Sequence, residues 1–236
     1  MSMRHLITAL FAALACTLVH PATAQNEGPS VPIMKAPYHL PVFKNEYVTL
    51  LNIYVPPGRN TGYHTHTGDS VSVNIEDADM TNQDLGAPQP APAQRSQRGR
   101  ANYADYRKQP RTHKASNVGS TSFHNVSFVF NSPQPAGFAP SSRADVSGYV
   151  QIMDNERVRG WRLVLEPGHA VAAITQQAPG VRIVVDGGEI VESVPGQPDR
   201  AMNPKLGEFY WQERGATRAV RNSGTTRIDL VEFELK

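Results

Sequence analysis

The chain carries one stretch of sequence twice, and this duplication constrains its fold more than any other feature. The segment "NEYVTLLNIYVPPG" (45–58) returns as "NERVRGWRLVLEPG" (155–168), 110 positions later. A later segment, "THKASNVGSTSFHNVSFVF" (112–130), resembles "TRAVRNSGTTRIDLVEFE" (217–234) in the same way. Turn residues and apolar positions stay in step over much of the chain, so each half is expected to build the same fold.

Each copy consists of short runs in which apolar and polar residues alternate. Examples are "VSVNI", "VSFVF", "RIVV" and "RIDLVEFEL", separated by Gly, Pro, Asn and Asp. Such runs are typical of all-β sandwiches and barrels. The sequence therefore predicts an all-β chain with two tandem barrels, over residues 25–135 and 136–236. The polar, Pro- and Gly-rich stretch 131–148 is the expected linker.

Residues 1–24 form a separate segment. A short basic start is followed by the apolar run "LITALFAALACTLV" and by "PATAQ", where Ala22 and Ala24 supply an A-x-A cleavage pattern. This pattern indicates a secretory signal peptide, so we expect cleavage after Ala24 and a periplasmic or secreted protein. A lipoprotein anchored through Cys16 is the alternative, although the leucine of its signal lies one place from the required position.

Composition limits the classes of partner. Cleavage would remove the only cysteine, so a disulfide framework is excluded and a packed core must stabilise the fold. It would also remove Arg4 and lower the formal net charge from +2 to +1. A chain so close to neutral has no general attraction to nucleic acid or to a membrane surface. We therefore expect a small-molecule partner, no nucleic acid and no membrane anchor.

A long segment interrupts the first copy. Residues 84–111 are rich in proline and then in arginine. Two interpretations remain open at this stage: a solvated surface excursion, or a lid or dimer-contact loop over the mouth of the first barrel.

Two histidines one residue apart, in "GYHTHTGDS" (62–70), indicate a metal site. In an extended strand, side chains two positions apart point to the same face, so His64 and His66 would project side by side. Tyr63 and Thr65 would then face the other way, and packing is the simpler role for Tyr63. His113, in "PRTHKASN", could supply a third imidazole, and such a set suits a divalent first-row metal.

These residues resemble the cupin superfamily, whose motifs are G-x5-H-x-H-x3/4-E-x6-G and G-x5-P-x-G-x2-H-x3-N. Gly58, His64 and His66 match the opening of the first motif, and His113 and Asn117 match the end of the second. The resemblance implies a bicupin of two RmlC-like double-stranded β-helix (jelly-roll) barrels. It also implies that the three histidines bind one divalent transition metal in the N-terminal barrel, with Fe, Mn, Zn and Ni as alternatives.

The chain departs from the family pattern in ways that leave the ligand set open. Ser70 and Val71 stand where the family has its glutamate, and Pro110 replaces a glycine. Asp69 is a candidate fourth ligand, or three histidines alone hold the metal. His124 and Asn117 are further candidates for contacts around the metal or for purely structural roles.

The second copy has lost the ligands. Ile174 and Gln176 occupy the H-x-H places, and Arg218 replaces the third histidine, so no metal is expected there. Either this degenerate barrel only supports the first, or it forms an anion pocket, for which the candidates are Arg182, Arg218, Gln176 and Trp211. A buried arginine needs a partner, and Glu189, Glu192 and Glu213 are the candidates.

Two function classes follow. The first is an exported small-molecule metalloenzyme of dioxygenase type, because three histidines can hold ferrous iron; no catalytic residue can be named. The second is a non-catalytic periplasmic protein that binds a metal or a small ligand. Cupins often dimerise, but a bicupin already pairs its barrels within one chain, so a homodimer and a monomer both stay open.

Overall fold

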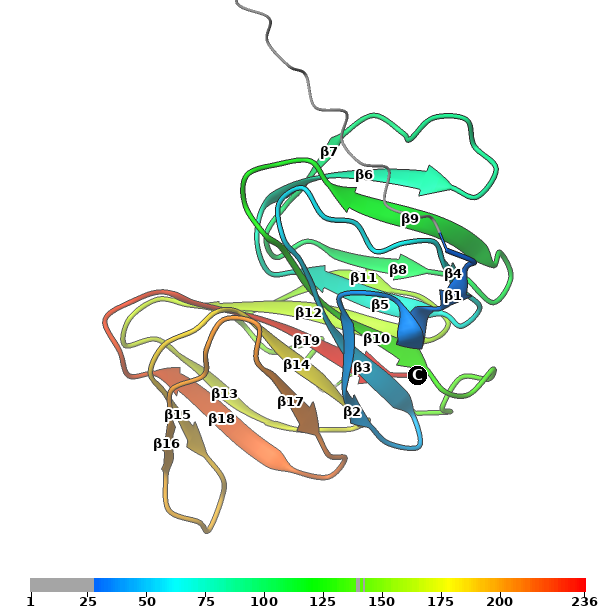
Figure 1. The fold of residues 1–236 in the computed structure, drawn as a ribbon. Coiled ribbons are helices and arrows are strands. Elements are labelled where there is room, and N and C mark those ends of the chain that lie inside the picture. Colours follow the sequence, from blue (N-terminus) through cyan, green and yellow to red (C-terminus); the bar gives the residue numbers. More distant parts are fainter. Residues whose placement is uncertain (1–27, 139–140, 142) are drawn as a thin grey trace, which may run out of the picture.

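The computed structural model describes residues 28–138, 141 and 143–236, and its regular structure there is β-strand apart from one 3-10 helix, η1 (Ile33–Lys35). The predicted all-β class is confirmed (Figure 1). The first half contains β1 (Val31–Pro32), β2 (His39–Lys44), β3 (Val48–Val55), β4 (His64–His66), β5 (Ser70–Asn74), β6 (Ala78–Asp84), β7 (Gln94–Ser96), β8 (Ala101–Ala104), β9 (Arg111–Asn117) and β10 (Phe123–Phe130). The second half contains β11 (Tyr149–Asp154), β12 (Val158–Leu165), β13 (Ala170–Thr175), β14 (Gly180–Asp186), β15 (Ile190–Ser193), β16 (Arg200–Met202), β17 (Phe209–Gln212), β18 (Thr217–Asn222) and β19 (Ile228–Leu235).

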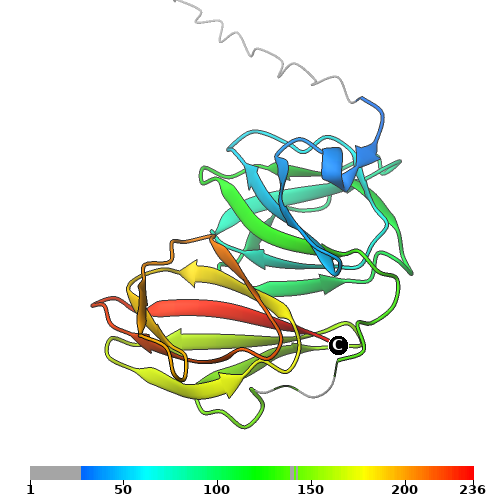
Figure 2. The same cartoon turned by 90° about the horizontal axis from the view of Figure 1, so that it is seen from below.

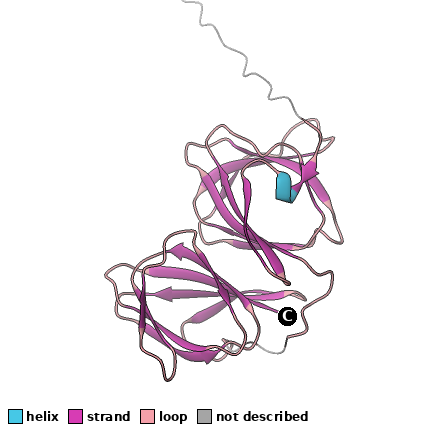
Figure 3. Cartoon of the chain, turned by 60° about the horizontal axis from the view of Figure 1, so that its bottom comes forward, coloured by secondary structure: helices cyan, strands magenta, loops and turns pink. Residues whose placement is uncertain are grey.

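The strands of each half form two sheets. In the first half the orders are β2-β3-β10-β5-β8 and β1-β4-β9-β6-β7. In the second half they are β11-β12-β19-β14-β17 and β13-β18-β15-β16, so the duplicated sequence has folded into a duplicated topology. Figure 2 shows the two halves as separate bodies of strands that meet along one side, and Figure 3 shows the strands of the first half running around a ring.

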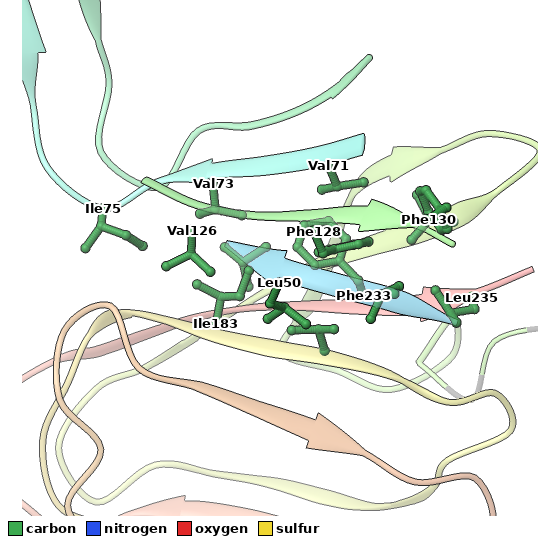
Figure 4. Close-up of a cluster of buried hydrophobic side chains, with 14 of the residues drawn as sticks. Leu50, Val71, Val73, Ile75, Val126, Phe128, Phe130, Ile183, Phe233 and Leu235 are labelled. Atoms are coloured by element: carbon green, nitrogen blue, oxygen red, sulfur yellow. The ribbon is translucent and has the colours of Figure 1, made fainter. Parts of the chain in front are cut away.

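The main hydrophobic core lies between the two barrels. Alternate residues of β5 and β10 project outward from the first barrel, among them Val71, Val126 and Phe128, and they pack against alternate residues of β14 and β19 (Figure 4). The rings of Phe128 and Phe233 meet edge to face at 5.3 Å. Strands β14 and β19 are therefore buried on both faces, which explains their nearly continuous burial.

The interiors of the two barrels differ. Leucine, isoleucine and valine side chains fill much of the second barrel, including Leu163, Ile190 and Leu230. The first barrel has polar side chains at many of its inward positions, such as Ser72, Asn125 and Ser127, and these line a cavity. The first barrel thus has a cavity with polar walls, whereas the interior of the second is filled. The candidate site therefore lies in the first barrel.

Residues 84–111 are more ordered than a solvated excursion. Their central part forms β7, which pairs with β6, and β8, which pairs with β5. Side chains from this segment, including Arg100 and Tyr106, line the cavity of the first barrel. Residues 94–104 therefore form part of the barrel wall, although much of the segment, including residues 86–93, is exposed to solvent.

The predicted signal peptide, residues 1–24, lies outside the described residues. Within the described part of the chain, no helix is both long and apolar enough to cross a membrane. The predicted linker contains no strand among its described residues, but its Arg143 is almost completely buried. That arginine belongs to the interior of the second barrel.

Candidate metal centre

Two neighbouring strands bring the three predicted histidine ligands together. His64 and His66 lie on the same face of β4, and His113 lies on β9, directly opposite His64 in the antiparallel register. Directly paired residues on adjacent strands have close side chains. All three imidazoles are buried, and Tyr63 is not among the residues that line the cavity beside them.

The three rings form a compact triangle. Ring centroids are 4.9 Å apart for His64 and His66, 4.6 Å for His64 and His113, and 5.0 Å for His66 and His113. Nε2 of His66 lies 3.0 Å from Nε2 of His113, and one nitrogen from each of the three residues lies within 4.8 Å of the others. Two nitrogens that bind one metal at about 2.1 Å and at right angles would be about 3 Å apart. The spacing of His66 and His113 therefore fits two ligands of one metal ion. A separation of up to 4.8 Å within the set would have to shorten on metal binding, because two bonds of about 2.1 Å span at most about 4.2 Å.

Carbonyl oxygens outside the triangle orient two of the rings. Nδ1 of His64 donates to the backbone oxygen of Gly62 at 3.1 Å, and Nδ1 of His113 donates to Oδ1 of Asn82 at 2.9 Å. Because Nδ1 carries the proton in each case, the lone pair of Nε2 is available toward the centre. This is the usual way in which proteins fix the tautomer of a metal-binding histidine.

Burial keeps the three imidazoles neutral. It lowers the pKa of His64 to about 4, that of His66 to about 3 and that of His113 to about 2, and repulsion from the neighbouring histidines and from Arg111 adds to the effect. Protons would therefore not compete with a metal for these nitrogens at neutral pH. Three neutral, converging nitrogens fit a divalent first-row metal.

A cavity of about 360 Å³ adjoins the triangle. Its polar walls come from both sheets and include Ser70, Ser72, Asn74, Asn102, Asn125 and Ser127. None of the described residues that line it is acidic, whereas Arg95 and Arg100 are among them. Such a cavity has the volume of a small-molecule site, with polar groups at many points of its wall.

Two residues beside the triangle were missed by the sequence analysis. The His39 ring, on β2, lies 4.7 Å from that of His64, and its Nδ1 donates to the backbone oxygen of Pro37 at 2.9 Å. The Tyr106 ring lies 4.4 Å from that of His66. His39 belongs to no motif, and Tyr106 lies in the irregular end of the 84–111 segment. The spacing of residues in the sequence therefore did not indicate that either side chain faces the histidines.

Comparison with known proteins rests on structure alone, because no family model and no curated protein matches the sequence. Salicylate 1,2-dioxygenase from Pseudaminobacter salicylatoxidans superposes with a TM-score of 0.57 at 12% identity, over 83% of this chain and 75% of that one. AerE from Microcystis aeruginosa gives 0.53 at 10% identity over 85% and 98%, and a cupin 2 conserved barrel domain protein from Leptotrichia buccalis gives 0.52 at 10% over 84% and 88%. The chain has the cupin fold in duplicate. The bicupin architecture expected from the sequence is thus confirmed.

The other candidates in this cupin barrel do not join the three histidines. The Asp69 carboxylate accepts the Arg107 backbone N–H at 3.0 Å and lies outside the triangle. Asn117 donates to the backbone oxygens of Val55 and Thr121, which fixes a turn. Nε2 of His124 donates to Oδ1 of Asn52 at 2.8 Å, and the ring lies against Gly207 of the other barrel, so His124 faces the junction between the barrels.

The second cupin barrel holds an ion network where the first holds histidines. Gln176 and Arg218, the counterparts of His66 and His113, do lie inside it, and Arg218 is 3.8 Å from Glu192. Arg182 donates to Glu192 and to Glu232, each at 2.6 Å. Burial by itself would raise the pKa of Glu232, but Arg182 and Arg143 outweigh it and lower this pKa to about 2.

Arg143 of the linker enters the same network. Its guanidinium donates to Glu232 at 2.7 Å, to Glu234 at 2.5 Å and to Gln176 at 2.9 Å. Three arginines thus meet three glutamates: Arg143, Arg182 and Arg218 with Glu192, Glu232 and Glu234. The positive charge that suggested an anion pocket is matched within the barrel.

Trp211 does not share that interior. Its ring stacks on those of Phe43 and Tyr47, at 5.8 and 6.0 Å, in the core between the barrels. Of the three glutamates considered as partners for a buried arginine, Glu192 has that role. Glu232 and Glu234 were missed, although they alternate with Val231, Phe233 and Leu235 in "VEFEL" and so had to share one face of a strand.

Proposed function

We propose that the N-terminal barrel binds one divalent transition metal through His64, His66 and His113, and that the protein is a metal-dependent oxidoreductase of dioxygenase type acting on a small molecule. The observation that carries the proposal is the convergence of three buried, neutral imidazoles beside a cavity of about 360 Å³. A divalent ion held by three neutral nitrogens keeps its full charge and open positions, and it would supply Lewis-acid or oxygen chemistry.

The walls of the cavity suit a small anionic substrate. Arg100 supplies positive charge, and no acidic side chain among the described lining residues would repel an anion. Asn102 and Ser127 can donate hydrogen bonds, while Tyr106 and Phe123 offer ring surface. A neighbour named salicylate 1,2-dioxygenase has the same fold, which supports this chemistry without selecting it, because one fold hosts many reactions.

Metal analysis tests the site, and oxygen uptake tests the reaction. We expect about one equivalent of metal in the purified protein and its loss in His64→Ala and in His113→Ala. The control is His124→Ala, since His124 lies at the junction between the barrels and should leave the metal content unchanged. Metal content unaffected by removal of both His64 and His113 would refute the proposal.

A non-catalytic binding protein is the second candidate. The described residues around the cavity include no carboxylate that could act as a general base, which favours binding over proton-transfer chemistry. Iron-loaded protein that takes up no oxygen with any of a panel of small aromatic and aliphatic carboxylates, yet binds one of them, would establish this alternative.

We also propose export, on the basis of the signal-like residues 1–24. The mature protein recovered from the periplasm or medium of an expressing bacterium should begin at Gln25. N-terminal sequencing checks this, and a protein that retains Met1 would contradict it.

A further inference from the structure

A chain of contacts runs from the second barrel to the metal-site histidines of the first. Asp69 lies three residues after His66 and is buried, with its side chain 6% exposed. Its Oδ1 accepts the N–H of Arg107 at 3.0 Å. That N–H belongs to the peptide that follows Tyr106, whose ring lies against His66 at 4.4 Å. Asp69 therefore holds the backbone that places the Tyr106 ring.

Arg157 of the second barrel stands behind Asp69. It lies in the turn between β11 and β12, and its Nη1 is 3.6 Å from Asp69 Oδ2. The guanidinium also donates to the backbone oxygens of Ser132 and Pro133, both at 2.8 Å, and covers the Phe130 ring at 4.5 Å. The side chain of Arg157 is 5% exposed, so these contacts are made in the interior of the molecule.

The backbone at Arg157 is itself fixed. Its N–H donates to Oδ1 of Asn155 at 2.9 Å, and its carbonyl accepts the N–H of Lys236 at 3.0 Å. The neighbouring Glu156 pairs with Lys108 at 2.7 Å, but both side chains are about two-thirds exposed, at 65% and 66%, so this pair contributes little. The buried contact between Arg157 and Asp69 is therefore the one through which the second barrel can fix the position of Arg107 and Tyr106.

We propose that Arg157 is a positioning residue for the metal site: it holds Asp69, which holds the Tyr106–Arg107 peptide and so sets Tyr106 against His66. The proposal rests on the proposed metal-binding function of the three histidines. It gives the second barrel a task, because the residue that orients one wall of the first cavity belongs to the copy that has no histidine ligands.

The test uses the full-length mature protein and the variant Arg157→Met, which keeps a long apolar side chain over Phe130. In the metal-free protein, NMR of the histidine side chains should show the His66 ring signals moving toward their positions in Tyr106→Leu, because the ring-current contribution of Tyr106 is lost. In titrations with Co²⁺, the Kd should rise, by less than the change of about 10- to 100-fold that follows loss of a direct hydrogen-bond partner of a metal ligand. The visible absorption spectrum of the Co²⁺ form should also change.

Two further variants separate positioning from general loss of stability. Leu163→Ala weakens the interior of the same second barrel without touching Asp69, and it should leave the His66 signals and the Co²⁺ Kd unchanged at temperatures where it is folded. Arg157→Lys keeps a positive charge beside Asp69 and should move the His66 signals less than Arg157→Met does. Should Arg157→Met not fold, Asp69→Ala cuts the same link and is expected to shift the His66 signals.

Unchanged His66 signals in folded Arg157→Met or Asp69→Ala would overturn the proposal, as would equal shifts in Leu163→Ala. Failure of the proposed function gives a different result: the wild-type protein would bind no Co²⁺, while the His66 signals of the metal-free protein would still report the link from Arg157 to Tyr106.

Discussion

At the scale of single residues, the site depends on partners that hold the imidazoles in one tautomer. Asn82 is such a partner, since its side-chain oxygen accepts the Nδ1 proton of His113. The counterpart of Asn82 in the second barrel is Glu192, 110 positions later, and it pairs with Arg218. The same position in each copy thus contacts His113 in the first barrel and its counterpart, Arg218, in the second.

Removal of the Asn82 oxygen should weaken metal binding. In Asn82→Leu the His113 ring loses the acceptor that fixes its tautomer, and we expect the Kd for Co²⁺ to rise about 10- to 100-fold. Isothermal titration calorimetry measures this. Gln83→Leu, one position along β6, is the matched control, and an equal effect in both variants would contradict a role in orienting His113.

The stability of the metal-free protein should fall as the pH is lowered from about 6.5, the pKa of an unperturbed histidine. His64, His66 and His113 have pKa values of about 4, 3 and 2 in the folded state, so between pH 6.5 and about 4 they bind protons only when the chain unfolds. Each then costs about 1.4 kcal/mol of unfolding free energy per pH unit. Urea unfolding at pH 7, 6 and 5 should show the slope, and replacement of all three by asparagine should reduce it.

At the scale of elements, strand periodicity accounts for what the sequence could reveal. His64 and His66 share a face because they lie two apart on β4, and the antiparallel pairing of β4 with β9 places His113 beside them. Arg143 and Tyr106 escaped prediction because they lie in irregular segments, where spacing says nothing about direction. Trp211, named as a candidate for the same pocket as Arg182, is paired with Val181 on the neighbouring strand and points to the opposite face of the sheet from Arg182.

Loss of the Arg143 guanidinium should destabilise the second barrel. Arg143→Met leaves Glu232 and Glu234 with fewer partners in a fully buried network, and breaking such a network costs about 3–5 kcal/mol. Urea unfolding measures the change, with the exposed Arg221→Met as control. A loss below about 1 kcal/mol would mean that the network does not depend on Arg143.

At the scale of the whole molecule, the two barrels share one core and should unfold together. Phe233→Ala removes a ring that packs on Phe128 of the other barrel, and we expect a loss of about 3–5 kcal/mol. Tryptophan fluorescence reports the second barrel through Trp161, and histidine NMR signals report the first. Both should follow a single transition, whereas two separate midpoints in the wild-type protein would contradict a shared core.

The apolar outer surface of β10 limits how such a chain can evolve. Without the second barrel, the outward side chains Val126, Phe128 and Phe130 would be exposed to water. They cannot turn inward, because the inward positions of the strand, such as Asn125 and Ser127, line the cavity. A descendant that deleted its second copy would have to recruit another molecule of itself onto this flank, or replace these three side chains with polar ones. The second copy therefore keeps an apolar flank of the first copy out of water, in addition to the proposed positioning role of Arg157.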